Sequence, residues 1–156
     1  MAACPRPIRF VMDKDIFRWP ILNFAFRSSK AIPIASARSD PALMEQAFAE
    51  VAKALDAGDL VGIFPEGKIT GDGNINPFRP GITRILERNP VPVVPMALRG
   101  LWGSTFSRIE GAAMKHPFRR GFFTRIELIS GNVIAASQAS PERLQAEVSR
   151  LRGDWR

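Results

Sequence analysis

The sequence is poor in the residues that cross-link a small protein or hold a metal in it. It contains one cysteine, Cys4, and one histidine, His116, among 156 residues. A single thiol excludes an internal disulfide, so nothing points to an oxidising compartment. The two residues also fall short of the ligands of a structural metal site, and we expect no metal. The length is still that of one ordinary domain, enough to bury a core without such cross-links.

Long apolar runs and long runs of like charge are also missing. The longest apolar stretches fall short of the roughly 20 residues that cross a bilayer. Residues 1–8 carry two prolines and lack the apolar segment of a signal peptide. The sequence contains no block of five like charges, so it does not indicate a disordered basic tail. The sequence therefore predicts a cytoplasmic protein whose membrane contact is peripheral.

Positive charge is what the chain has in excess. It carries 22 lysines and arginines against 15 acidic residues, a formal net charge of +7. Such a surface favours polyanions: nucleic acid, anionic lipid headgroups or phosphorylated metabolites. Basic residues are interleaved with aromatic ones at 116–123, and three interpretations stay open. The first is a core with a solvated arginine rim, the second is a surface on an anionic membrane, and nucleic acid comes last because no binding module is recognised.

Apolar patterning alternates between strands and helices along the chain. The expected strands are 8–12, 31–35, 60–64, 91–98 and 122–129. The expected helices begin at Pro20, run from Asp40 to Gly58, and cover 80–87 and 140–151. This alternation predicts a single α/β domain with a mostly parallel central sheet flanked by helices. The runs 60–64 and 91–98 are typical of strands covered on both faces.

The loop that leaves the third expected strand carries the chemistry. Residues 64–70 read Phe-Pro-Glu-Gly-Lys-Ile-Thr, at the strand end where ligands gather in open α/β sheets. Gly67 lets the backbone approach a ligand, and Lys68 and Thr70 supply a charge and a hydroxyl suited to phosphate. The carboxylate of Glu66 would repel a phosphate. We therefore expect Glu66 to orient a neighbouring cation or to accept a hydrogen bond from a substrate hydroxyl. Taken alone, the segment is more simply a turn.

The order of several segments resembles the glycerolipid acyltransferase family, whose members acylate glycerol phosphate and lysophospholipids. The third block of that family reads Phe-Pro-Glu-Gly, matched here from Phe64 and Pro65 onward. Its fourth block is a hydrophobic strand punctuated by prolines, matched by Pro92 and Pro95 within 91–98. The form Glu-Gly-Lys-Ile-Thr looks most like bacterial members in which this domain is fused behind a transporter-like membrane domain.

The resemblance implies a glycerol-3-phosphate acyltransferase-like fold and an activity. A fatty acyl group would pass from acyl-CoA or acyl carrier protein, as co-substrate, to a lysophosphatidate or lysophospholipid acceptor at the inner face of the membrane. Glu66, Gly67 and Lys68 would bind the acceptor, with Thr70 and Arg38 as further candidates. Arg38 follows the strand at the place of a basic residue in the second block, although a surface arginine without a special role fits equally. No metal or organic cofactor is implied.

The catalytic block of the family, a histidine and an aspartate in the pattern His-x4-Asp, is absent. The resemblance implies that this pair deprotonates the acceptor hydroxyl. His116 has Gly121 at the aspartate position, lies after the fourth block, and has basic neighbours that lower its affinity for a proton. We therefore expect no catalytic residue here and an incomplete domain that lacks its N-terminal strand and helix. The alternative is a non-enzymatic basic module that binds anionic lipid or nucleic acid.

Overall fold

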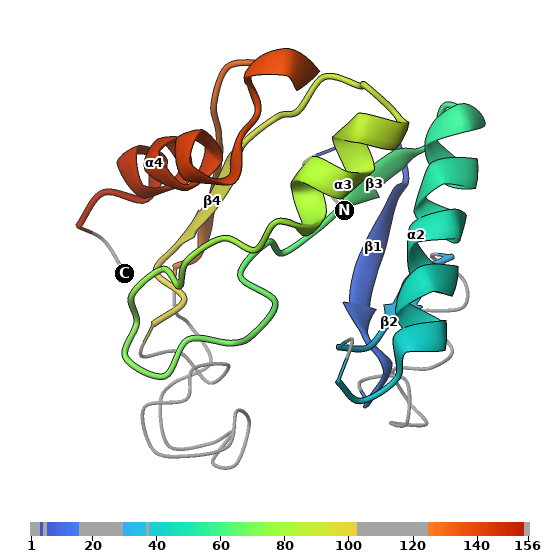
Figure 1. Cartoon of the computed structure of the whole chain (residues 1–156). Helices are drawn as coiled ribbons and strands as arrows, with labels where there is room; N and C mark the ends of the chain where they lie inside the picture. The colour runs from blue at the N-terminus through green and yellow to red at the C-terminus, as the bar shows by residue number, and fades with distance from the viewer. Residues whose placement is uncertain (1–3, 5, 16–29, 37, 103–124, 155–156) are drawn as a thin grey trace. The chain divides into compact units, whose positions relative to one another are not determined.

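The computed structural model describes residues 4, 6–15, 30–36, 38–102 and 125–154 (Figure 1). They form two compact units, one of residues 1–64 and 84–91 and the other of residues 65–83 and 92–156. The architecture is α/β with a parallel sheet, as the alternation of strands and helices predicts. The helix expected to begin at Pro20 lies outside the described residues. So do His116 and its basic neighbours.

The first unit is built on a three-stranded parallel sheet in the order β2–β1–β3. The strands are β1 (Ile8–Asp13), β2 (Ile32–Ile34) and β3 (Leu60–Gly62). Pro33 lies on β2, which pairs with a described strand on one side only. Proline has no N–H for a ladder, so this edge position is the one expected for it.

Helix α2 (Pro41–Asp56) packs across β2 and β3 (Figure 1). Asp40 caps it, because its Oδ1 accepts a hydrogen bond of 3.0 Å from the backbone N–H of Leu43. Val51 of the helix and Ile32 of the sheet, each 2% exposed, are central to the core of the unit. The expected helix from the Asp40 cap onward is confirmed.

Strand β3 ends two residues before the apolar run does. The run predicted a strand to Phe64 that is covered on both faces, but β3 stops at Gly62 and all its residues are only half-buried. The ring of Phe10 lies across the strand at Gly62, where an added Cβ would come within 2.7 Å of it. Phe64 stacks on that ring, with centroids 6.1 Å apart, and is 56% exposed. The chain then turns at Pro65.

The second unit consists of an antiparallel ribbon and a helix. Its strands are β4 (Met96–Arg99) and β5 (Glu127–Ser130), and its helices are the 3-10 turn η2 (Ala136–Gln138) and α4 (Pro141–Arg152). Ser140 caps α4 through a bond of 3.2 Å from the N–H of Arg143 to its Oγ. Leu144 and Leu151 of α4 are buried, and α4 packs on the ribbon. The expected final helix is confirmed.

The strand expected at 91–98 is shorter than predicted and covered on one face only. It starts at Met96, because Pro92 and Pro95 offer no N–H to a partner strand. Burial then alternates, from Ala97 at 3% exposed to Leu98 at 40%. This period of two is typical of an antiparallel strand with one packed face.

Helix α3 (Gly81–Arg88) agrees with the prediction at 80–87 and has residues in both units. Within the first unit, Arg84 forms an ion pair with Glu45 and lies over the ring of Phe48, 4.2 Å from its centroid. In the described part of the chain, no helix has both the length and the apolar character needed to cross a membrane.

Candidate functional site

Residues 65–79, here called the motif loop, connect β3 to α3 and belong wholly to the second unit. The two ends of the loop meet, because the N–H of Arg79 donates a hydrogen bond of 2.9 Å to the carbonyl of Pro65. A long loop without secondary structure that closes on itself is frequently a functional one. The sequence-predicted residues Glu66, Gly67, Lys68 and Thr70 all lie in it.

Glu66 bridges the two arms of the motif loop. Its Oε2 accepts hydrogen bonds from the backbone N–H of Asn76, at 2.6 Å, and from the side-chain Nδ2 of the same residue, at 3.0 Å. Two donors on one carboxylate oxygen hold the side chain in one orientation. The other oxygen, Oε1, has no hydrogen-bond partner among the described residues. Glu66 therefore braces the loop and keeps one acceptor oxygen free.

Gly67 lies directly beneath the side chain of Arg79. Its φ is +62°, in the left-handed region, and a Cβ added to it would be 2.9 Å from the Nε of Arg79 and 3.1 Å from its Cζ. Only glycine meets both conditions without strain. Because Gly67 has no side chain, the guanidinium of Arg79 can lie above it, and the backbone can approach a ligand.

Arg79 is the site residue that sequence reasoning misses. Twelve positions separate it from Gly67 along the chain, and no periodicity or spacing rule links the two. Only the closure of the loop at Pro65 brings them together. The sequence does carry one signal, a basic residue just before the first residues of α3, but such residues are common on protein surfaces.

Two cations are available around Gly67. The side chains of Lys68 and Arg79 are exposed, and neither is paired with a described carboxylate. Arginine and lysine without an acidic partner are the usual ligands of a phosphate group, to which they donate charge-assisted hydrogen bonds. The arrangement is therefore suited to an anion.

Thr70 is engaged in a turn of the loop itself. Its hydroxyl donates to Oδ1 of Asp72 at 2.9 Å and accepts from the N–H of Gly73 at 3.0 Å. Asp72 also accepts from the backbone and side chain of Asn74, at 2.9 and 2.8 Å. These bonds, first those from Asn74 and then that from Thr70, lower the pKa of Asp72 to about 2. The proton that Thr70 was expected to offer a phosphate is already donated within the turn.

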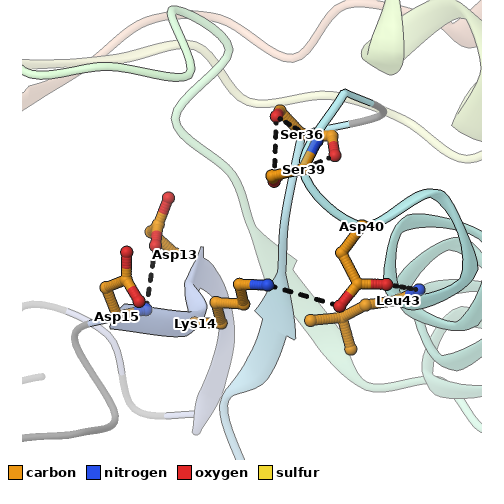
Figure 2. Close-up of polar contacts among 7 residues, drawn as sticks. All are labelled: Asp13, Lys14, Asp15, Ser36, Ser39, Asp40 and Leu43. Carbon is orange, nitrogen blue, oxygen red and sulfur yellow. Dashed lines mark hydrogen bonds and ion pairs between the residues drawn. The ribbon is translucent and has the colours of Figure 1, made fainter.

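Arg38 lies in the first unit, exposed in the turn between β2 and α2. In that turn the carbonyl of Ser36 accepts from the N–H groups of Ser39 and Asp40, both at 3.0 Å. Figure 2 shows the turn beside the end of β1, where Lys14 forms an ion pair of 3.3 Å with Asp40. Because Arg38 and the motif loop belong to different units, a share of Arg38 in phosphate binding stays a prediction.

A family model described as Acyltransferase matches residues 1–99, a range that includes the whole motif loop. The chain belongs to the acyltransferase family. This confirms the family that the order of the Phe-Pro-Glu-Gly and proline-punctuated blocks indicated.

Three relatives are plant proteins named 1-acyl-sn-glycerol-3-phosphate acyltransferase. The one from Brassica napus, chloroplastic BAT2, is 30% identical over 92 residues, which is 59% of this chain and 26% of that protein. The one from Limnanthes alba is 33% identical over 91 residues, 58% of this chain and 32% of that protein. The one from Cocos nucifera is 38% identical over 114 residues, 69% of this chain and 36% of that protein. The chain thus spans about a quarter to a third of the length of these acyltransferases.

A solved acyltransferase structure shares the fold. The crystal structure of the 1-acyl-sn-glycerophosphate acyltransferase PlsC from Thermotoga maritima matches with a TM-score of 0.64 at 19% identity. The match covers 91% of this chain and 54% of that one. The expected glycerol-3-phosphate acyltransferase-like architecture is therefore confirmed at the level of the fold.

Proposed function

We propose that this chain provides the acceptor-binding part of an acyltransferase of phospholipid biosynthesis, with a lysophosphatidate-type lysophospholipid as the acceptor. The observation that carries the proposal is the pair of cations, Lys68 and Arg79, that have no acidic partner among the described residues and lie at the glycine of the family's motif loop. The names of the plant relatives, each a 1-acyl-sn-glycerol-3-phosphate acyltransferase, support this acceptor class.

The candidate residues have distinct parts in the proposal. Lys68 and the Arg79 guanidinium donate charge-assisted hydrogen bonds to the acceptor phosphate. Gly67 lets the phosphate approach the backbone. The free Oε1 of Glu66 accepts a hydrogen bond from a glycerol hydroxyl, while its Oε2 stays bound to Asn76. Arg38 is a further candidate for the phosphate.

The reaction of the whole enzyme needs a base, and the His-x4-Asp pattern that supplies it in the family is absent from this sequence. The acceptor hydroxyl oxygen attacks the carbonyl carbon of an acyl thioester, a C–O bond forms, and the C–S bond breaks. The hydroxyl loses its proton and the thiol of acyl-CoA or acyl carrier protein leaves. A base near neutral pKa has to take that proton, and the His-x4-Asp pattern is absent from the 156 residues. We therefore infer that the chain binds the acceptor without transferring the acyl group.

The setting of the reaction follows from its substrates and from the charge. Lysophospholipid acceptors reside in membranes, and a net charge of +7 favours peripheral contact with an anionic inner face. The form Glu-Gly-Lys-Ile-Thr of the loop supports a place among the bacterial transporter-fused members. A non-enzymatic module for anionic lipid or nucleic acid is the rival.

Titration with glycerol 3-phosphate, followed by backbone amide shifts, tests the proposal. We expect shifts at Gly67 and Lys68 and an affinity about tenfold lower for Arg79→Gln, as for the loss of one charge-assisted bond. Arg88→Gln removes an exposed arginine at the end of α3 and is the matched control, for which we expect no change. The absence of loop shifts, or equal weakening in both variants, would overturn the proposal in favour of a general basic surface. Acyl transfer by the chain itself would overturn its inferred inactivity.

A further inference from the structure

Helix α4 holds the motif loop at two points. Gln145 accepts, through Oε1, a hydrogen bond of 3.0 Å from the backbone N–H of Phe78. Arg152 donates from Nη1 to the carbonyl of Gly73 at 2.9 Å. The helix covers Pro141–Arg152, whereas the family model ends at residue 99. A segment outside the family match therefore contacts the family's loop.

The point at Gly73 is enclosed on more than one side. Gly73 is buried, with φ of +81°. A Cβ on it would come within 2.7 Å of the ring of Trp102, which follows β4. With the Trp102 ring against Gly73 and Arg152 on its carbonyl, this part of the loop has little room to move.

The point at Phe78 is next to the phosphate-binding cation. Gln145 fixes the N–H of Phe78, and the next N–H along the chain, that of Arg79, is the one that closes the loop on Pro65. Two consecutive backbone groups are thus held, one by α4 and one by the other end of the loop. They set where the Arg79 side chain leaves the backbone, and therefore its position over Gly67.

Helix α4 is itself well anchored in the second unit. Arg99 of β4 donates from Nε to the carbonyl of Leu151 at 2.8 Å. Leu144 and Leu151 are buried, and Gly131 leaves room for Leu151, whose Cδ1 would be 3.1 Å from a Cβ there. A helix that is tied down in this way can hold a loop in place instead of moving with it.

Arg152 makes its bond to Gly73 while another of its donors stays without a partner among the described residues. Its Nε–H is buried and has no hydrogen-bond partner within the described residues. A buried donor without a partner is unfavourable, and an apolar side chain of similar length would avoid that cost. The carbonyl of Gly73 is what the guanidinium gains in this position.

We propose that α4 positions the motif loop, with Gln145 and Arg152 as positioning residues for the anion site at Gly67 and Arg79. What the loop binds rests on the proposed function, whereas the holding of the loop does not. The helix thus preorganises the acceptor phosphate site from outside the family-matched region, which lowers the entropy lost on binding.

Single-amide hydrogen exchange on the full chain tests the holding. In Gln145→Leu and Arg152→Met we expect the loop amides to exchange about tenfold or more faster, at Phe78 and around Gly73 respectively, because local opening no longer breaks a bond to α4. Exchange at Val51 of the first unit should not change. Gln145→Glu should restore slow exchange, since a carboxylate oxygen also accepts the N–H of Phe78.

Two matched controls separate the loop contacts from general surface effects. Gln138→Leu removes an exposed glutamine whose Oε1 bonds to Arg143, and Arg150→Met removes an arginine paired with Glu147 of its own helix. Neither should speed exchange in the loop. Unchanged loop exchange in both test variants, or equally faster exchange at Val51, would overturn the positioning role.

A second measurement links the holding to the site. Titration with glycerol 3-phosphate should give an affinity lower by about three- to tenfold in both test variants, although neither residue is expected to touch the ligand. Affinity equal to that of the unaltered chain would overturn the link to binding. If the unaltered chain does not bind glycerol 3-phosphate, the proposed function fails, while the exchange data still decide on the positioning helix.

Discussion

Gly67 is the residue at which backbone conformation and the placement of a cation depend on each other. Its φ of +62° favours glycine, and the guanidinium of Arg79 occupies the space of a side chain. In this loop, which we propose binds phosphate, any larger residue at position 67 would therefore both strain the backbone and displace the guanidinium of Arg79.

The first prediction concerns Gly67→Ala. A left-handed residue with a Cβ costs about 1–2 kcal/mol, and that Cβ would displace Arg79 from 2.9 Å. We expect the affinity for glycerol 3-phosphate to fall about tenfold or more, measured by calorimetric titration. Gly71→Ala is the matched control, because a Cβ there would have no heavy atom within 4 Å among the described residues apart from its chain neighbours. Equal effects of the two changes would contradict the role of Gly67.

The second prediction tests how Glu66 braces the motif loop. Glu66→Ala leaves two donors of Asn76 without their acceptor, a loss of about 1–3 kcal/mol in the free energy of unfolding of the second unit. Glu66→Gln keeps a carbonyl oxygen for them, so we expect a clearly smaller loss in thermal or denaturant unfolding. An equal loss for glutamine and alanine would contradict the bridging account, because an acceptor oxygen at this place would then not be enough to hold Asn76.

Among the elements, the turn at residues 70–74 is held by hydrogen bonds to a carboxylate and is therefore sensitive to acid. The bonds that Asp72 accepts from Asn74 and Thr70 favour its charged form and lower its pKa from 3.8 to about 2. A lowered pKa means that the turn's stabilisation is complete above pH about 4 and is lost as the pH falls through about 2.

The third prediction is the acid titration of this turn. We expect the amide shifts of Gly73 and Asn74 to stay constant from pH 7 to about 4 and then to change with a midpoint near pH 2, the pKa of Asp72. Amide NMR against pH measures it. Thr70→Val removes one donor and should move the midpoint upward. A midpoint at the ordinary value of 3.8 in the unaltered chain would show that Asp72 does not accept these hydrogen bonds in solution, and would contradict this account of the turn.

Elements with local signals could be predicted from the sequence, and those decided by packing could not. Helix α2 carries its own start in Asp40 and Pro41, and the structure has it there. The apolar run at 91–98 does not say which face is covered, so Leu98 was expected inside and is 40% exposed.

The candidate site divides in the same way. Residues 66–70 could be found because they are consecutive in the family motif. The partners that give them their geometry could not. Asn76 and Arg79 come to lie beside Glu66 and Gly67 only when the loop has closed, and Gln145 reaches the loop from α4. The bond from the hydroxyl of Thr70 to Asp72 was not predicted either, although the two residues are only two positions apart.

At the scale of the whole molecule, a net charge of +7 has to be told apart from a specific site. Long-range attraction to an anionic surface is screened by salt, with a Debye length of about 10 Å at 0.1 M and 3 Å at 1 M. Charge-assisted hydrogen bonds within a preorganised loop are less affected by salt, because geometry and short distance contribute to them.

The fourth prediction uses vesicles to make this distinction. On phosphatidylglycerol vesicles at low salt we expect binding, and a loss of most of it at 0.5 M NaCl, because the attraction is mainly long-range. Arg79→Gln and Arg88→Gln should weaken that binding equally, since each removes one charge. When lysophosphatidate is added to the vesicles, the unaltered chain and Arg88→Gln should gain salt-resistant binding that Arg79→Gln lacks. If all three proteins respond alike to lysophosphatidate, the motif loop does not bind its phosphate specifically, and the net charge of the whole molecule accounts for the binding.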